Sequence, residues 1–81
     1  MATASASRDK TPRHLRKRSF RLAGHGTSVA LEPEFWVALE EFAAKDGRSL
    51  AAIVEAVDGA RADPTAPLAS ALRVFILAQR A

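Results

Sequence analysis

Basic side chains are concentrated near the N-terminus of this 81-residue chain. Seven of its 12 Lys and Arg residues fall between positions 8 and 21, where Asp9 is the single acid. Such a block attracts polyanions, because each phosphate contact releases condensed counterions whatever the base sequence. The alternative is a solvated tail that only aids solubility, and the choice depends on the elements beside the block.

Residue types that support catalysis or metal binding are scarce. The chain has no Cys, and its two His cannot form a four-ligand zinc site without carboxylates. It contains no Gly-x-Ser-x-Gly, no glycine-rich phosphate loop and no His-Glu-x-x-His. Glu40 and Glu41 fall on a face that the helical period makes solvated. We therefore expect no enzymatic activity, no metal and no cofactor.

The lack of Cys suits a reducing compartment. Residues 1–19 contain no apolar signal segment, and the most apolar run, 68–78, is too short to span a bilayer. The basic block lacks the apolar face with which an amphipathic segment enters a membrane surface. We expect a cytoplasmic protein with no membrane partner.

Residues 1–17 show no periodic apolar pattern and contain a helix-breaking proline, which predicts a disordered basic arm. The folded domain is expected over residues 18–81. An alternating pattern covers 20–22, is interrupted by Gly24-His25-Gly26, and resumes over 27–31. This predicts either a hairpin or one long kinked strand, with Thr27–Leu31 as the firm strand and Phe20–Leu22 as a less regular extension.

Two helices are expected to follow. Pro33 suits a first helical position, and Gly47 is the expected stop. Trp36, beside Phe35, is expected in the core rather than as an exposed partner anchor. Ser49 caps the second helix. The apolar positions that we expect to form the core of a dimer are Val29, Leu31, Phe35, Leu39, Phe42, Ile53, Val54 and Val57.

Loop residues with two prolines and a glycine occupy 58–67, and a third helix should start near Leu68 with Thr65 as its cap. Its apolar stripe is expected to cover the dimer core, although a partner's docking surface is the alternative. The predicted fold is therefore mainly α with one short β-strand and an extra C-terminal helix.

A single short strand leaves its backbone groups unpaired and needs a partner. The simplest partner is the same strand of a second copy, which makes an intermolecular antiparallel ribbon in an intertwined homodimer. Val29 and Leu31 would face the helices, while Gly26, Ser28 and Ala30 would face outward. The major groove of B-DNA is wide enough to admit such a ribbon.

The run Thr-Ser-Val-Ala-Leu-Glu-Pro-Glu-Phe-Trp at 27–36, followed by Gly-Arg-Ser-Leu-Ala-Ala-Ile-Val at 47–54, resembles the ribbon-helix-helix family of bacterial and phage repressors and antitoxins. The Arg-Leu-Ala-Gly-His start and the late Ala-Leu-Arg-Val-Phe-Ile-Leu helix are similar to a subgroup found in alphaproteobacteria. The resemblance implies a dimer whose paired strands enter the major groove. It also implies a phosphate clamp at the start of the second helix.

The outward strand positions are small here, so they offer little side-chain hydrogen bonding to bases. Basic residues just before the strand are expected to compensate, in a groove or on phosphates. His25 lies between glycines, where a plain turn role is the alternative to DNA contact. The full set of expected DNA-contacting residues is Arg16, Lys17, Arg18, Arg21, His25, Ser28, Ala30, Arg48 and Ser49.

The sequence thus predicts a nucleoid-associated, DNA-binding homodimer that acts as a transcriptional regulator or antitoxin-like repressor. The alternative is a protein-interaction module of the same fold, which does not recognise DNA sequence and uses the C-terminal helix to bind another protein. Salt dependence separates the two, because phosphate contacts weaken steeply as salt rises.

Overall fold

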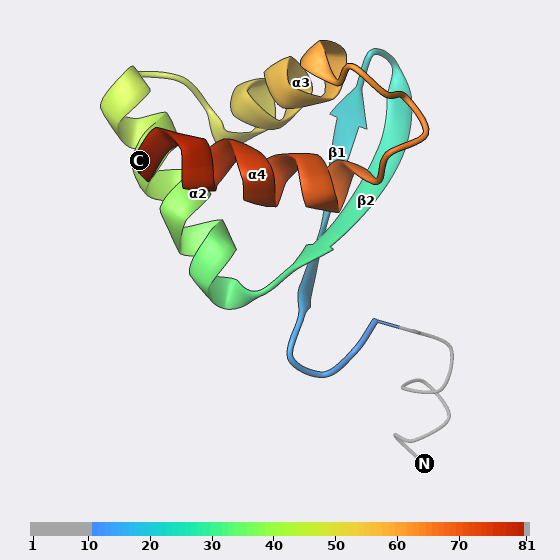
Figure 1. Ribbon diagram of the computed structural model, residues 1–81, viewed down its shortest axis with the longest axis horizontal. Helices are drawn as coiled ribbons and strands as arrows, with labels where there is room; N and C mark the ends of the chain where they lie inside the picture. The colour runs from blue at the N-terminus through green and yellow to red at the C-terminus, as the bar shows by residue number, and fades with distance from the viewer. Residues whose placement is uncertain (1–10, 81) are drawn as a thin grey trace.

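The computed structural model describes residues 11–80, which form a β-hairpin followed by three helices (Figure 1). The order of elements is β1 (Arg16–Leu22), β2 (His25–Leu31), α2 (Pro33–Asp46), α3 (Leu50–Ala60) and α4 (Leu68–Arg80). The strand–helix–helix order expected of a ribbon-helix-helix fold is present, with the additional C-terminal helix. The first ten residues of the expected arm lie outside the described part, while β1 starts two residues before the expected domain boundary.

The two strands pair antiparallel within one chain, from Arg16 opposite Leu31 to Leu22 opposite His25. Their connection is the two-residue turn Ala23-Gly24, with φ of 51° and 84°. Positive φ at both positions is the geometry of a type I′ turn, whose twist suits a hairpin. Of the two alternatives that the alternating pattern allowed, the hairpin is the one observed.

The expectation of one short strand per chain was therefore wrong. The first strand starts at Arg16 rather than Phe20. Its first three residues are all basic and show no apolar alternation, but they pair with β2 in the ladder. The partner strand expected from a second copy is supplied by the chain itself. Gly26, expected in the break, belongs to β2.

The limits of α2 agree with the sequence prediction. Pro33 is its first residue, and Gly47 ends it at φ 69°, with its N–H on the carbonyl of Ala44 at 3.3 Å. Arg48 N–H bonds the carbonyl of Ala43 at 3.0 Å. This pair of bonds satisfies carbonyls that the end of a helix leaves free.

Ser49 caps α3 as predicted, since its hydroxyl accepts the N–H of Ala52 at 3.1 Å. The helix then continues through Ala60, three residues into the expected loop. Gly59 lowers helix propensity by about 1 kcal/mol relative to Ala, which is too little to end a helix held by buried neighbours. Arg61 follows the helix and donates to Asp58 at 2.8 Å and to the carbonyl of Ala66.

Thr65 does not act as the expected cap of α4. Its hydroxyl and its backbone N–H both donate to Asp63, at 2.6 and 2.9 Å. This local turn competes with capping, as Asp side chains often do in loops. The helix instead starts directly after Pro67, whose carbonyl accepts the N–H of Ala71 at 3.1 Å.

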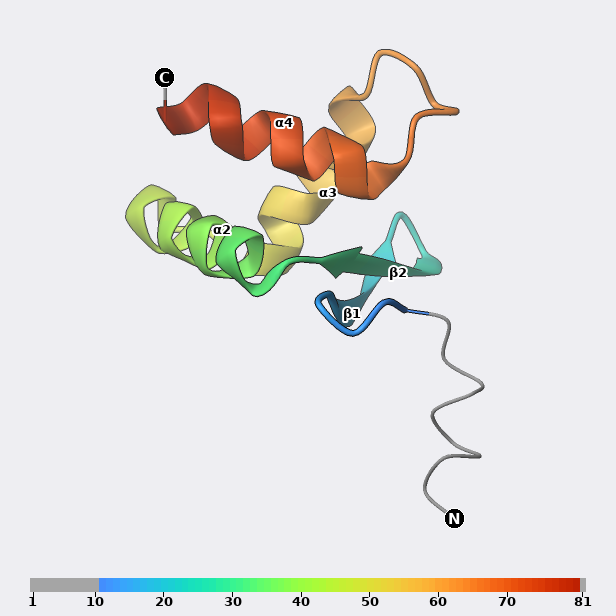
Figure 2. The same ribbon diagram turned by 60° about the horizontal axis from the view of Figure 1, so that its bottom comes forward.

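The core forms inside a single chain, with the helices on one side of the hairpin (Figure 2). Trp36, only 2% exposed, is a core residue as predicted. Phe35 and Phe42 are partly buried and pack against the core. The other six residues expected in a dimer core are all buried: Val29, Leu31, Leu39, Ile53, Val54 and Val57. Within residues 11–80, no helix has the length and apolar character needed to cross a membrane.

Candidate nucleic-acid interface

The hairpin has two faces of different chemistry, because side chains alternate along each strand. One face turns toward the helices and buries Leu22, Val29 and Leu31. The predicted orientation of β2, with Val29 and Leu31 inward, is therefore correct. The ladder places six residues together on the opposite face, here called the outer face: Lys17, Ser19, Arg21, Gly26, Ser28 and Ala30.

Each long or polar residue of β1 on the outer face lies opposite a small residue of β2. The pairs are Lys17 with Ala30, Ser19 with Ser28, and Arg21 with Gly26. All six residues are exposed except Ala30, which is half-buried. On this face, two cationic side chains of β1 therefore lie opposite small side chains of β2, and none of the six residues is acidic.

Hydroxyls occupy the centre of the outer face. Ser19 Oγ and Ser28 Oγ are 3.1 Å apart, and either atom can be the donor. At the turn end, the Arg21 guanidinium lies 3.4 Å from the carbonyl oxygen of Gly24. A serine hydroxyl both donates and accepts, so the centre of the face is compatible with either kind of base edge.

Arg18, in contrast, is held against α2. Its guanidinium donates to Glu40 at 2.8 Å and lies 4.9 Å from the ring centroid of Trp36. The indole N–H of Trp36 donates to the carbonyl of Arg16 at 2.7 Å. These contacts attach β1 to the first helix.

Arg16 and His25 also do not lie on the outer face. Arg16 lies on the inward side of the alternation and donates to the carbonyls of Arg13 and Leu15, at 3.0 and 3.2 Å. His25 is exposed at the first position of β2, opposite Leu22. Both residues are exposed at the ends of the ladder.

The predicted phosphate clamp is separate from the outer face. α3 begins beside the end of α2 and finishes near the hairpin turn (Figure 1), where Ala23 N–H donates to Glu55 at 3.3 Å. Ser49 uses its hydroxyl to cap the helix, and Arg48 Nε donates to Asp46 at 2.6 Å. Four predicted contact residues, Lys17, Arg21, Ser28 and Ala30, are thus brought together, whereas Arg48 and Ser49 lie at the other end of α3.

Sequence reasoning missed Ser19 and the role of β1 as a full strand. The signal was present as a second alternation, in which Lys17, Ser19 and Arg21 fall between Arg18, Phe20 and Leu22. It was obscured because arginine occupies both the inward and the outward positions, so hydrophobicity alone does not separate the two faces.

Two carboxyl groups outside the hairpin have perturbed acidity. The pKa of Glu32 is lowered by a hydrogen bond from its own backbone N–H and by Arg73, which lies 2.9 Å away. The pKa of Asp63 is lowered by hydrogen bonds from Thr65. Both arrangements stabilise the fold and lie apart from the outer face. Within residues 11–80, no three His, Cys, Asp or Glu side chains gather in a way that would hold a metal ion.

The ribbon-helix-helix domain family matches residues 15–80 of this chain. Among solved structures, the chain is similar to an uncharacterized protein from Bordetella pertussis Tohama I. The two are 32% identical with a TM-score of 0.73, and the similarity covers 99% of this chain and 68% of the other. No curated protein sequence matches the chain. Since the family match spans both strands and all three helices, the chain belongs to the ribbon-helix-helix family.

Proposed function

We propose that this protein is a homodimeric DNA-binding protein of the bacterial cytoplasm, associated with the nucleoid, which acts as a transcriptional regulator or antitoxin-like repressor. The observation that carries the proposal is the outer face of the hairpin, where Lys17 and Arg21 are exposed and none of the six ladder residues is acidic. A ribbon of this width fits the major groove of B-DNA.

Phosphate contacts are expected to supply most of the affinity. The basic block leads directly into β1, so a ribbon in the groove brings its cations close to the two phosphate backbones. Arg13 and Arg16 immediately precede the outer-face residues and are exposed. Such contacts fix position and orientation, while base edges provide specificity.

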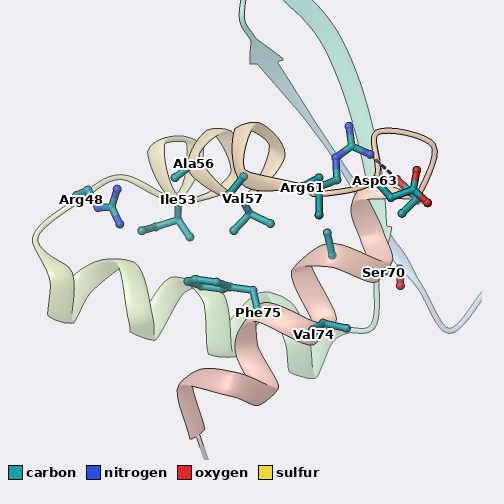
Figure 3. A pocket seen from close by; sticks show the side chains of 13 residues that line it. Arg48, Ile53, Ala56, Val57, Arg61, Asp63, Ser70, Val74 and Phe75 are labelled. Atoms are coloured by element: carbon teal, nitrogen blue, oxygen red, sulfur yellow. Dashed lines mark hydrogen bonds between the residues drawn. The ribbon is translucent and has the colours of Figure 1, made fainter.

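A second copy is expected to cover the apolar groove between α3 and α4, a space of about 530 Å³ (Figure 3). Ile53, Ala56 and Val57 of α3 face Phe75 of α4 across it. Val74, also in the lining, is 63% exposed and extends the apolar surface of the groove. Phe75, which also lines this groove, is only partly buried by its own chain, and this supports a homodimer contact there.

DNA binding is tested with a fluorescent random-sequence duplex and the full chain across a salt series. We expect affinity to fall steeply with salt, with a log–log slope of about −0.9 for each phosphate neutralised. A full-length variant with Arg8→Gln and Lys10→Gln should show a flatter slope. Absence of binding at low salt would contradict the proposal and favour the alternative, a protein-interaction module of this fold.

The homodimer is tested by sedimentation equilibrium. Val74→Asp places a charge in the groove and should shift the protein toward monomer. Leu77→Asp is the matched control, since Leu77 is 61% exposed on the same helix but does not line this groove. Equal behaviour of the two variants would place the dimer contact elsewhere.

A further inference from the structure

We infer that β1, rather than β2, supplies the side chains that distinguish bases, and that Lys17 and Arg21 select guanines at two positions of one half-site. This inference rests on the proposed function, because it specifies how the outer face would contact DNA. It assigns base recognition to the first strand of the hairpin.

The chemistry of the two cations favours guanine. Guanine presents the O6 and N7 acceptors in the major groove, and Arg or Lys contacts to this pair are the commonest specific contacts. Both side chains are exposed on the same face of one strand. Residues four apart on a strand lie about 13 to 14 Å apart. Two contacted guanines should accordingly fall within a half-site of about four base pairs.

The small residues of β2 make this contact sterically feasible. Gly26 lies opposite Arg21, and Ala30 lies opposite Lys17. Without bulk on the neighbouring strand, the ribbon can approach base edges closely enough for the β1 side chains to reach them. β2 thus sets the depth of insertion and leaves the hydrogen bonding to β1.

The central Ser19 and Ser28 pair adds adaptable hydrogen bonding between the two cations. Each hydroxyl is within 3.1 Å of the other in the free chain, so neither loses a partner away from DNA. On DNA, one hydroxyl can keep this bond while the other contacts a base between the two guanines. Hydroxyls donate or accept, so this middle position should be less selective than the flanking ones.

Arg18 does not take part in this selection. It lies between Lys17 and Arg21 in sequence, yet its contacts with Glu40 and the Trp36 ring hold it on the other face. The division between two outward cations and one inward arginine gives the half-site a defined spacing. A flexible basic arm would impose no such spacing.

The test is selection from a duplex library with about eight randomised base pairs, bound by the full chain, followed by affinity measurements on the enriched sequence. We expect enriched sequences with two guanines within about four base pairs. Arg21→Ala should remove the preference at one of these positions and Lys17→Ala at the other, each with a loss of about 5- to 150-fold in discrimination.

Two further full-length variants make the test specific. Arg80→Ala removes the same charge at the end of α4, where Arg80 forms an ion pair with Glu41 of α2 at 3.5 Å, and should leave the base preference unchanged. Gly26→Val adds bulk to the outer face where a new Cβ meets no atom within 4 Å. It should preserve thermal stability and lower affinity for the enriched sequence by at least about tenfold, a loss of about 1.4 kcal/mol.

The outcomes separate the inference from the proposed function. If the wild-type chain binds no duplex, the proposed function fails and the inference fails with it. If it binds but Lys17→Ala and Arg21→Ala match Arg80→Ala in base preference, DNA binding stands and the assignment to β1 is wrong. Retained affinity in Gly26→Val would show that the ribbon does not enter the groove by this face.

Discussion

The two faces of the hairpin use similar residues for opposite purposes. On the inner face, Arg18 is fixed by Glu40 and by the Trp36 ring, opposite the buried Val29. On the outer face, Arg21 is exposed beside a glycine. The alternation of the strand alone separates the two arginines, which are three residues apart. Position on the pleat, rather than residue type, determines which cation stabilises the fold and which remains accessible to a ligand.

This comparison predicts that stability and DNA affinity are controlled by different faces. Changes on the inner face should alter the free energy of unfolding, whereas changes on the outer face should alter binding. The following four experiments measure stability, in order of decreasing expected effect, and the first two test this separation directly.

Trp36→Ala should give the largest loss of stability, about 3 to 5 kcal/mol, since the side chain is buried and its N–H bonds Arg16. Ser28→Ala, on the outer face, should stay within about 0.5 kcal/mol of the wild type. Urea denaturation followed by circular dichroism measures both. Comparable losses in the two variants would contradict the division between the faces.

Arg18→Ala should lower stability by about 1 kcal/mol. It removes a cation–π contact, worth about 0.5 to 1 kcal/mol, and a solvent-exposed ion pair, worth about 0.2 to 1 kcal/mol. Arg21→Ala is the matched control, with the same substitution and an expected change below about 0.5 kcal/mol. The same denaturation experiment applies, and a larger effect from Arg21→Ala would reverse the assignment of the two faces.

Ala23→Asn should raise stability by about 0.5 to 1 kcal/mol without altering either face. Ala23 has φ of 51°, a left-handed conformation that alanine adopts unfavourably and that Asn tolerates. Gly24→Ala should instead lower stability, since its φ is 84°. Thermal melting compares them. A stability loss in Ala23→Asn would indicate that the turn is not of this type.

The smallest expected effect is a change in stability with pH, and it arises at Glu32, outside the hairpin. The pKa of Glu32 is lowered below its ordinary value of 4.5 in the folded protein. The ionised Glu32 side chain therefore stabilises the fold fully above pH 4.5, and this contribution is lost as the pH falls through the lower pKa of the folded state. The difference in stability between wild type and Glu32→Gln should therefore shrink in acid. Urea denaturation at pH 7 and pH 3 measures it. A difference that grows toward pH 3 would contradict the lowered pKa of Glu32.

Much of the helical part was predictable because its signals are local. Pro33, Gly47 and Ser49 act at single positions through backbone geometry and capping, so they fix helix limits without reference to the rest of the chain. Thr65 and Gly59 were misinterpreted for the complementary reason. A local turn engages Thr65, and packing against the core carries α3 past Gly59.

The candidate interface was only half predictable. The outward orientation of Ser28 and Ala30 followed from the alternation of β2, but the contribution of Ser19 did not, because β1 has no clear apolar period at its basic start. The assignment of Arg18 to DNA contact came from its place in the basic block. Its engagement by Glu40, 22 residues later, was not visible in local sequence.

By itself, the sequence determined the concentration of cations near the N-terminus, the limits of the first helix and the cap of the second. These features depend on charge counts and on local backbone preferences. Only the tertiary structure decided that a second strand comes from the same chain, which arginines face inward, and that the start of α3 lies away from the outer face. Those features depend on strand pairing and helix packing between distant residues, where burial and hydrogen bonding outweigh local preference.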